Sequence, residues 1–178
     1  AGIKVSDLDA VALSGGPGSY TGLRIGASTS KGLCFGGDIP LISLNTLLVI
    51  AAMAKAKYTD SYDFIVPMID ARRMEVYTMI TNVKFDKLSE VEAKIIDAES
   101  FAEYKGKKLL FCGNGAPKCS EILACEGFTF IDGIYPSAEY MGELAETAFN
   151  SKKFEDLVYY DPFYLKEFIA TTSKKSLF

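Results

Sequence analysis

Histidine is absent from this chain of 178 residues. Its absence excludes a Ser-His-Asp triad, a Cys-His pair, a histidine general base and any histidine-ligated metal. The cysteines are few and scattered, at Cys34, Cys112, Cys119 and Cys125. Because none of them forms a CxxC pair, a zinc site would need all of them from distant places. We therefore expect no metal, and reduced cysteines in a cytoplasmic protein.

An excess of positive charge and a long apolar run are missing as well. The net charge is −4, which argues against a stand-alone nucleic-acid-binding protein, because such a protein needs a basic stripe. The longest apolar stretch, Leu41 to Met53, is interrupted by polar residues and is too short to span a bilayer. No secretory leader opens the sequence. Its first residues, Ala1 to Val5, look like the end of an element, so we expect that an N-terminal portion is missing.

The composition that remains is that of a globular domain, with 49% hydrophobic and 24% charged residues. Apolar runs between turn residues predict strands, and helical spacing predicts helices, with N-caps at Asn45 or Ser43 and at Ser137. The expected strands cover 9–14, 40–43, 64–69, 74–80, 93–96, 108–112 and 128–131. The expected helices cover 21–35, 45–57, 100–104, 117–124 and 137–150. This alternation predicts an α/β fold with antiparallel pairing in the second half.

A glycine-rich segment, SGGPGSYTGLRIGAS at 14–28, follows the first expected strand and opens the first long helix. Strand, glycine loop and helix is the layout of a phosphate-binding loop. A Walker loop, however, needs a lysine where this chain has Tyr20-Thr21-Gly22. The dinucleotide fingerprint fails too, because Gly16, Gly18 and Gly22 miss the G-x-G-x-x-G spacing by one residue. Neither phosphate motif is satisfied.

Small residues recur at every fourth position of this segment, at Gly18, Gly22, Gly26, Ser30 and Cys34. On a helix they form a row along one face. Each interior glycine costs a helix about 0.8–1.0 kcal/mol relative to alanine, so the row needs a reason. A small-residue row lets another backbone approach closely. That neighbour can be the chain's own sheet, a partner helix or a ligand.

Several longer motifs carry a resemblance to a known family. They are the segment 7–33 that contains the glycine loop, SLNTL at 43–47, IDARRMEVY at 69–77, GNG at 113–115, PSA at 136–138 and YLK at 164–166. Taken together they cover nearly the whole chain, and the sequence closely resembles the TsaB (YeaZ) family. Older names for this family are glycoprotease and peptidase M22 homologue.

The resemblance implies a two-lobed α/β fold, the actin/Hsp70/sugar-kinase-like fold with a ribonuclease H-like motif. The N-terminal part of lobe one is then missing from this chain. Residues 1–58 are expected to be the remnant of lobe one, and 61–178 to form lobe two with a mixed sheet. Helix 137–150 is expected to pack back on lobe one. The strand at 9–14 would become an edge strand with unpaired backbone groups.

The resemblance also implies a function, that of a non-catalytic scaffold in the bacterial complex that forms N6-threonylcarbamoyladenosine in tRNA. The expected partners are a TsaD-like catalytic subunit and a TsaE-like ATPase, or a second copy of the chain in their absence. ATP and metal are expected to bind to those partners. The chain is expected to meet tRNA only as part of the complex and to bind no membrane. The implied partner interface is Gly18, Ser19, Tyr20, Thr21, Gly22, Leu23, Arg24, Gly26, Ser30 and Cys34.

Two alternatives stay open from the residues. Asp70, Arg72 and Arg73 can lie in the cleft between the lobes and help to hold a nucleotide, as in an ATP-dependent enzyme of the same superfold. The other reading of Asp70 is a turn aspartate that bonds its own backbone or pairs with a neighbouring arginine. A metal-free M22-like peptidase has the weakest support, because Ser19 and Thr21 have no candidate base.

Overall fold

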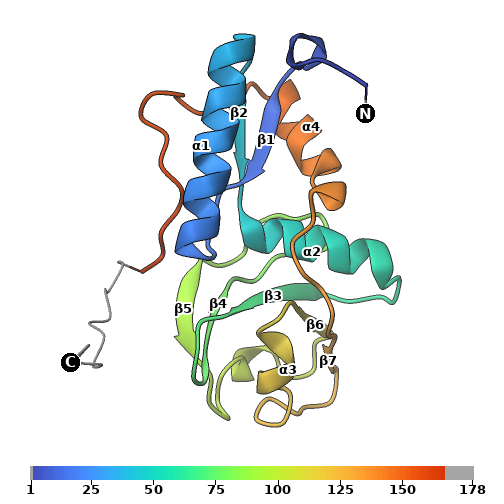
Figure 1. Cartoon of the computed structure of the whole chain (residues 1–178). Coiled ribbons are helices and arrows are strands. Elements are labelled where there is room, and N and C mark those ends of the chain that lie inside the picture. The colour runs from blue at the N-terminus through green and yellow to red at the C-terminus, as the bar shows by residue number, and fades with distance from the viewer. Residues whose placement is uncertain (1, 167–178) are drawn as a thin grey trace, which may run out of the picture.

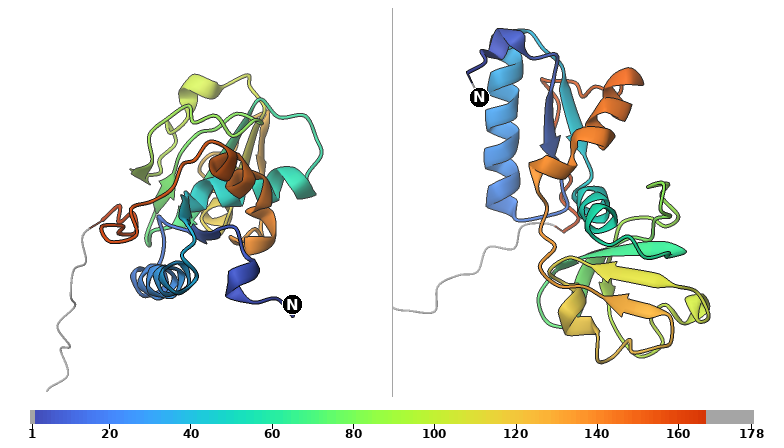
Figure 2. Two further views of the ribbon diagram at one scale, coloured as in Figure 1. Left: turned by 90° about the horizontal axis from the view of Figure 1, so that it is seen from above. Right: turned by 90° about the vertical axis from the view of Figure 1, so that its right-hand side faces the viewer.

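The computed structural model describes residues 2–166 and shows two lobes joined by a central helix (Figure 1). The smaller lobe has a parallel sheet of β1 (Val11–Ser14) and β2 (Leu41–Leu44), with Val11 opposite Leu41. Helix α1 (Tyr20–Gly37) covers one face of this sheet and α4 (Gly142–Asn150) covers the other, as Figure 2 shows from above.

The second lobe is a mixed sheet of five strands in the order β5-β4-β3-β6-β7. The strands are β3 (Phe64–Asp70), β4 (Glu75–Thr78), β5 (Glu92–Ile95), β6 (Leu109–Cys112) and β7 (Phe128–Phe130). β3, β6 and β7 run parallel, whereas β3, β4 and β5 pair antiparallel, as expected for the second half. The short elements are η1 (Val5–Asp7), η2 (Ala102–Tyr104), α3 (Ala116–Cys119) and η3 (Ala138–Tyr140).

Helix α2 (Thr46–Lys57) lies between the lobes and is apolar on most sides. The Asn45 side chain accepts a hydrogen bond from the Leu47 amide at 2.8 Å, which confirms Asn45 as the N-cap. Ile50 packs with the core of the five-stranded sheet, while Val49 packs with Ile42 of β2. A helix that is buried on several sides carries no single apolar stripe.

The expected helix 137–150 is wrong as a single element. Ser137 does accept a hydrogen bond from the Glu139 amide, but it caps only the short turn η3, and α4 begins afresh at Gly142. The segment changes cores at this point: Tyr140 packs beside α2, whereas Leu144 packs against β2. A straight helix could not reach both cores. The helix expected at 117–124 is also shorter, because α3 ends at Cys119 and turns follow it.

Candidate functional site

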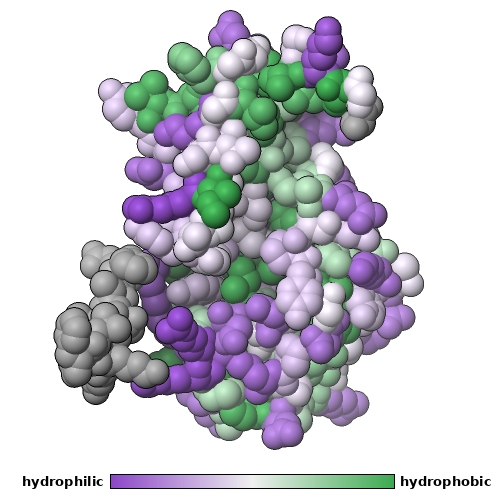
Figure 3. All heavy atoms as spheres, in the orientation of Figure 1, coloured by the Kyte–Doolittle hydropathy of each residue, from purple (hydrophilic) through white to green (hydrophobic). Residues whose placement is uncertain are grey.

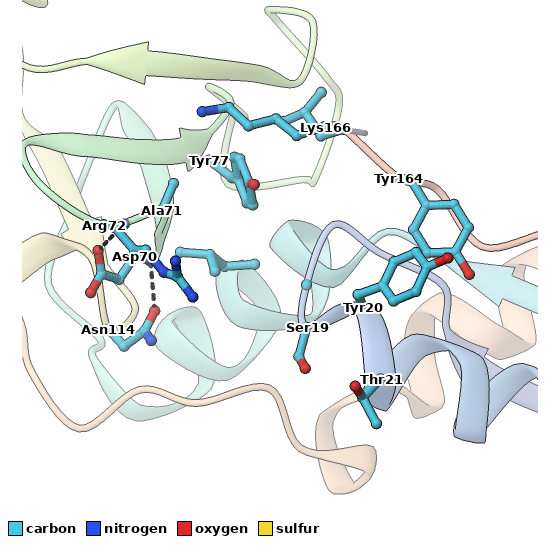
Figure 4. A pocket seen from close by; sticks show the side chains of 13 residues that line it. Ser19, Tyr20, Thr21, Asp70, Ala71, Arg72, Tyr77, Asn114, Tyr164 and Lys166 are labelled. Carbon is cyan, nitrogen blue, oxygen red and sulfur yellow. Dashed lines mark hydrogen bonds between the residues drawn. The ribbon is translucent and has the colours of Figure 1, made fainter. Parts of the chain in front are cut away.

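A pocket of about 640 Å³ opens between the two lobes. Its walls are the start of α1, the turn between β3 and β4, and the end of a segment that we call the strap, residues 154–166 (Figure 4). Of the residues predicted for a cleft, Asp70 and Arg72 line it. Arg73 is exposed beside them and does not line the pocket.

The space beside the glycines of the loop is occupied by other atoms of this chain. A Cβ on Gly15 would lie 2.0 Å from Ser43 Oγ, and a Cβ on Gly16, where φ is +117°, would lie 2.4 Å from the carbonyl oxygen of Phe163. The Thr46 hydroxyl accepts a hydrogen bond from the Gly16 amide at 3.1 Å. These glycines therefore allow β2, α2 and the strap to pack closely against the loop.

Ser19 is the N-cap of α1. Its Oγ accepts a long hydrogen bond of 3.5 Å from the Gly22 amide, so the hydroxyl has a structural partner. Thr21 is exposed on the next turn. Among residues 2–166, no group of three or more Cys, Asp or Glu side chains is arranged to hold a metal ion. Neither hydroxyl lies in an arrangement that would make it a nucleophile.

The carboxylate of Asp70 is engaged within its own lobe. Its Oδ1 accepts hydrogen bonds from the Arg72 amide at 2.8 Å and from Lys118 Nζ at 2.5 Å. These contacts, with Lys118 as the largest cause, lower the pKa of Asp70 below its ordinary value of 3.8. The Asp70 amide in turn donates to Asn114 Oδ1 at 3.0 Å. Asp70 thus holds the turn in shape and has little freedom to bind a cation.

Lys118 is a clamp that sequence reasoning missed. Besides Asp70, its ammonium group donates to the carbonyl oxygens of Arg73 and Glu75, each at 2.7 Å. It thereby supports a turn in which Arg72 and Arg73 have positive φ angles of 72° and 48°. Such angles are costly for residues with side chains, so the clamp stabilises a strained turn. The GNG motif just before α3 was the only sequence signal near it.

The strap lies along one flank of α1 (Figure 1). Lys31 Nζ donates to the carbonyl oxygens of Val158 and Tyr160, each at 3.1 Å. Farther along, the rings of Tyr20 and Tyr164 lie 5.0 Å apart. The last described residue, Lys166, pairs with Glu75 of the second lobe. The strap therefore connects α1 with β4 across the pocket.

Three residues predicted for the partner interface are in the core instead. Leu23, Ser30 and Cys34 are only 7%, 8% and 0% exposed. Cys34 packs with Leu13 of β1, and burial raises the pKa of its thiol. The row of small residues therefore turns toward the chain's own sheet over its second half. At Gly26 an added Cβ would lie 3.5 Å from Leu13 Cδ1, which is ordinary packing distance.

The opposite side of α1 is exposed and nearly uncharged. We call it the outer face, and its members are Thr21, Gly22, Ile25, Ser28, Thr29, Gly32, Leu33, Phe35 and Gly36. Ile25 and Phe35 are 63% and 84% exposed. Figure 3 shows pale and green atoms over the middle of α1, with purple atoms on its flank and around β5. Of the predicted interface, Thr21 and Gly22 lie on this face. Arg24 lies at its edge, above the Tyr20 ring.

The comparisons with known proteins agree with this fold. The family model for "TsaD: tRNA N6-adenosine threonylcarbamoyltransferase" matches residues 1–173. A "tRNA threonylcarbamoyladenosine biosynthesis protein TsaB" from Haemophilus influenzae is 30% identical over 93% of this chain and 73% of its own length. A TsaB from Bacillus subtilis is 31% identical, and this chain spans 65% of its length. A tRNA N6-adenosine threonylcarbamoyltransferase from Clostridium beijerinckii is 27% identical over 94% of this chain and 48% of its own length.

Solved structures show the same arrangement of elements. YeaZ from Pseudomonas aeruginosa superposes with a TM-score of 0.81 at 22% identity, over 92% of this chain and 76% of its own length. The fold is thus the α/β fold of the YeaZ structures. Among the described residues, no helix is long and apolar enough to cross a membrane. The chain belongs to the TsaB (YeaZ) family of tRNA threonylcarbamoyladenosine biosynthesis proteins.

Proposed function

We propose that this chain is a non-catalytic scaffold that docks a TsaD-type catalytic subunit through the outer face of α1. The observation that carries this proposal is the exposure of Ile25 and Phe35 on a helix face that has no carboxylate. An apolar face of this kind is unfavourable in water and marks a surface that another protein covers. Glycines on the same face allow that protein's backbone to come near.

The partner we propose is a chain of the same fold. This chain is similar both to TsaB proteins and to threonylcarbamoyltransferases of the TsaD family. Two related folds can present corresponding helices to each other about an approximate two-fold axis. We assign ATP hydrolysis to a TsaE-type ATPase and metal binding to the TsaD-type subunit. In this proposal the assembly works in the cytoplasm and meets tRNA only as a complex.

The contacts around the pocket favour a structural role for its carboxylate. Asp70 accepts from Lys118 and from its own turn, so it is not free to act as a base or to bind Mg²⁺. Titration calorimetry with ATP and Mg²⁺ tests the alternative of an ATP-dependent enzyme. Micromolar binding with turnover by the chain alone would favour that enzyme over the scaffold.

The docking proposal is tested by placing a charge on the outer face. Ile25→Asp should weaken binding to a TsaD-type subunit at least tenfold, because a buried unpaired carboxylate opposes association. Isothermal titration calorimetry measures the loss. Ile95→Asp is the matched control, since Ile95 is 71% exposed on β5, in the other lobe. Equal affinities for both variants and the wild type would refute docking through α1.

A further inference from the structure

The strap is fixed firmly to the smaller lobe as far as Phe163. The Tyr160 ring is 8% exposed and packs in the core between α1 and the two-stranded sheet. Its hydroxyl lies 2.9 Å from Ser43 Oγ. The Phe163 amide donates to the carbonyl oxygen of Gly15 at 2.8 Å. A buried ring and a backbone hydrogen bond are costly to break, so this part of the strap stays on the smaller lobe.

The end of the strap, residues 164–166, is held more loosely, through side chains. The Tyr164 ring lies 5.0 Å from that of Tyr20, and Lys166 pairs with Glu75 of β4. In this ion pair the Lys166 side chain is 46% exposed and that of Glu75 is 21% exposed. A partly exposed ion pair contributes little net stability, and salt weakens it further. The end of the strap can therefore leave the second lobe while the rest stays bound.

Glu75 is a fixed receptor for Lys166. Its amide donates to the carbonyl oxygen of Arg72 at 3.2 Å, and its carbonyl oxygen accepts from the Ala71 amide at 3.1 Å. The same carbonyl oxygen accepts from Lys118 Nζ at 2.7 Å. The backbone of Glu75 is thus part of the clamped turn. The ion pair therefore joins a releasable end of the strap to a fixed point of the second lobe.

We propose that residues 164–166 are a latch on the pocket between the lobes, fixed at Phe163 and released when the ion pair of Lys166 with Glu75 breaks. All three residues line the pocket, and Figure 4 shows the two labelled ones along one side of it. When the latch swings away, the pocket loses this wall and opens to solvent. A charged molecule that competes for either partner of the ion pair releases the latch. The inference concerns this pocket alone and holds whether or not α1 docks a partner.

The latch is tested by the access of a neutral thiol reagent to the pocket. Ala71 lines the pocket, so Ala71→Cys in a Cys125→Ser background places a reactive thiol there, while the remaining cysteines are buried. Glu75→Gln removes the ion pair and should raise the rate of N-ethylmaleimide labelling about two- to fivefold at low salt. With Glu75 intact, the rate should rise with salt toward that of the variant. The rate of the variant should not depend on salt.

The same ion pair is tested from its other end. Lys166→Met should accelerate labelling as much as Glu75→Gln, and the double variant should be no faster than either single one, because each change alone already breaks the pair. Additive effects would show that the two residues act separately, and the latch would be wrong. Circular dichroism verifies that every variant is folded.

Matched controls separate the latch from a general effect of charge. Glu92→Gln removes a comparable ion pair, with Lys94 on β5, and should leave labelling at position 71 unchanged. Ala56→Cys places a thiol at an exposed position of α2, and its labelling should not respond to Glu75→Gln. Equal labelling at position 71 with and without Glu75→Gln would overturn the proposal. An equal acceleration by Glu92→Gln would overturn it as well.

Discussion

Two phenylalanine rings, one in each lobe, lie in opposite surroundings. In the five-stranded lobe Phe111 is fully buried, and its ring stacks on Phe130 with centroids 4.6 Å apart. In the smaller lobe Phe35 is 84% exposed at the end of α1. The first ring stabilises its own lobe, whereas the second contributes little to folding. In the proposed function, this exposed ring of α1 is part of the face that docks another chain.

The largest expected effect comes from removing one ring in each lobe. Phe111→Ala should lower the free energy of unfolding by about 3–5 kcal/mol, because it leaves a cavity in a packed core. Phe35→Ala should change it by no more than about 0.5 kcal/mol, because its ring is already in water. Urea denaturation of both variants measures the difference. Comparable losses of unfolding free energy in both variants would show that Phe35 is part of a core, and the contrast between the two rings would be wrong.

A smaller effect is expected at the clamp of the strained turn. Lys118→Met removes three hydrogen bonds, to Asp70 and to the carbonyl oxygens of Arg73 and Glu75. We expect a loss of about 1–2 kcal/mol in unfolding free energy. Amide exchange should become faster in 70–75 and stay unchanged in α1. If amide exchange in residues 70–75 of the variant stays as slow as in the wild type, the turn is stable without Lys118.

The smallest effect concerns pH. The pKa of Asp70 is lowered in the folded protein, so the folded state favours the charged carboxylate. That stabilisation is present above the ordinary pKa of 3.8 and is lost as the pH falls through the lowered folded value. Asp70→Asn should therefore be less stable than the wild type at neutral pH, and the gap should narrow in acid. A gap that is constant from pH 7 to about pH 2 would contradict this assignment.

Much of the fold could be predicted from the sequence, because strands and helices leave local signals. The strands at 64–69 and 108–112 and the helix at 45–57 are confirmed within a few residues. The prediction of a single helix at 137–150 was wrong, because the break in this segment depends on which core each half packs against. The local sequence does not show this. Lys118 was missed for a similar reason, since its partners lie more than forty positions away in the sequence.

The glycine-rich helix shows the same limit at the candidate site. The four-residue spacing predicted a row on one face of a helix, but the row shifts around α1, from Gly22, which is exposed, to Cys34, which is buried. The structure buries Ser30 and packs Cys34 with Leu13 and Leu41 of the chain's own sheet. The exposure of Ile25 and Phe35 could not be predicted, because it depends on which side of α1 packs against the sheet in the folded lobe. The strap on the flank of α1 likewise could not be seen, because it is far away in sequence.

Hydrogen exchange with a TsaD-type subunit tests the central claim most directly. The full chain is exchanged alone and in the complex, and protection is compared peptide by peptide. We predict that protection on binding is concentrated in residues 21–36 of α1 and is absent from the strands of the five-stranded lobe. Protection confined to the turn at 70–73 and the start of the glycine loop, with α1 unchanged, would contradict the account.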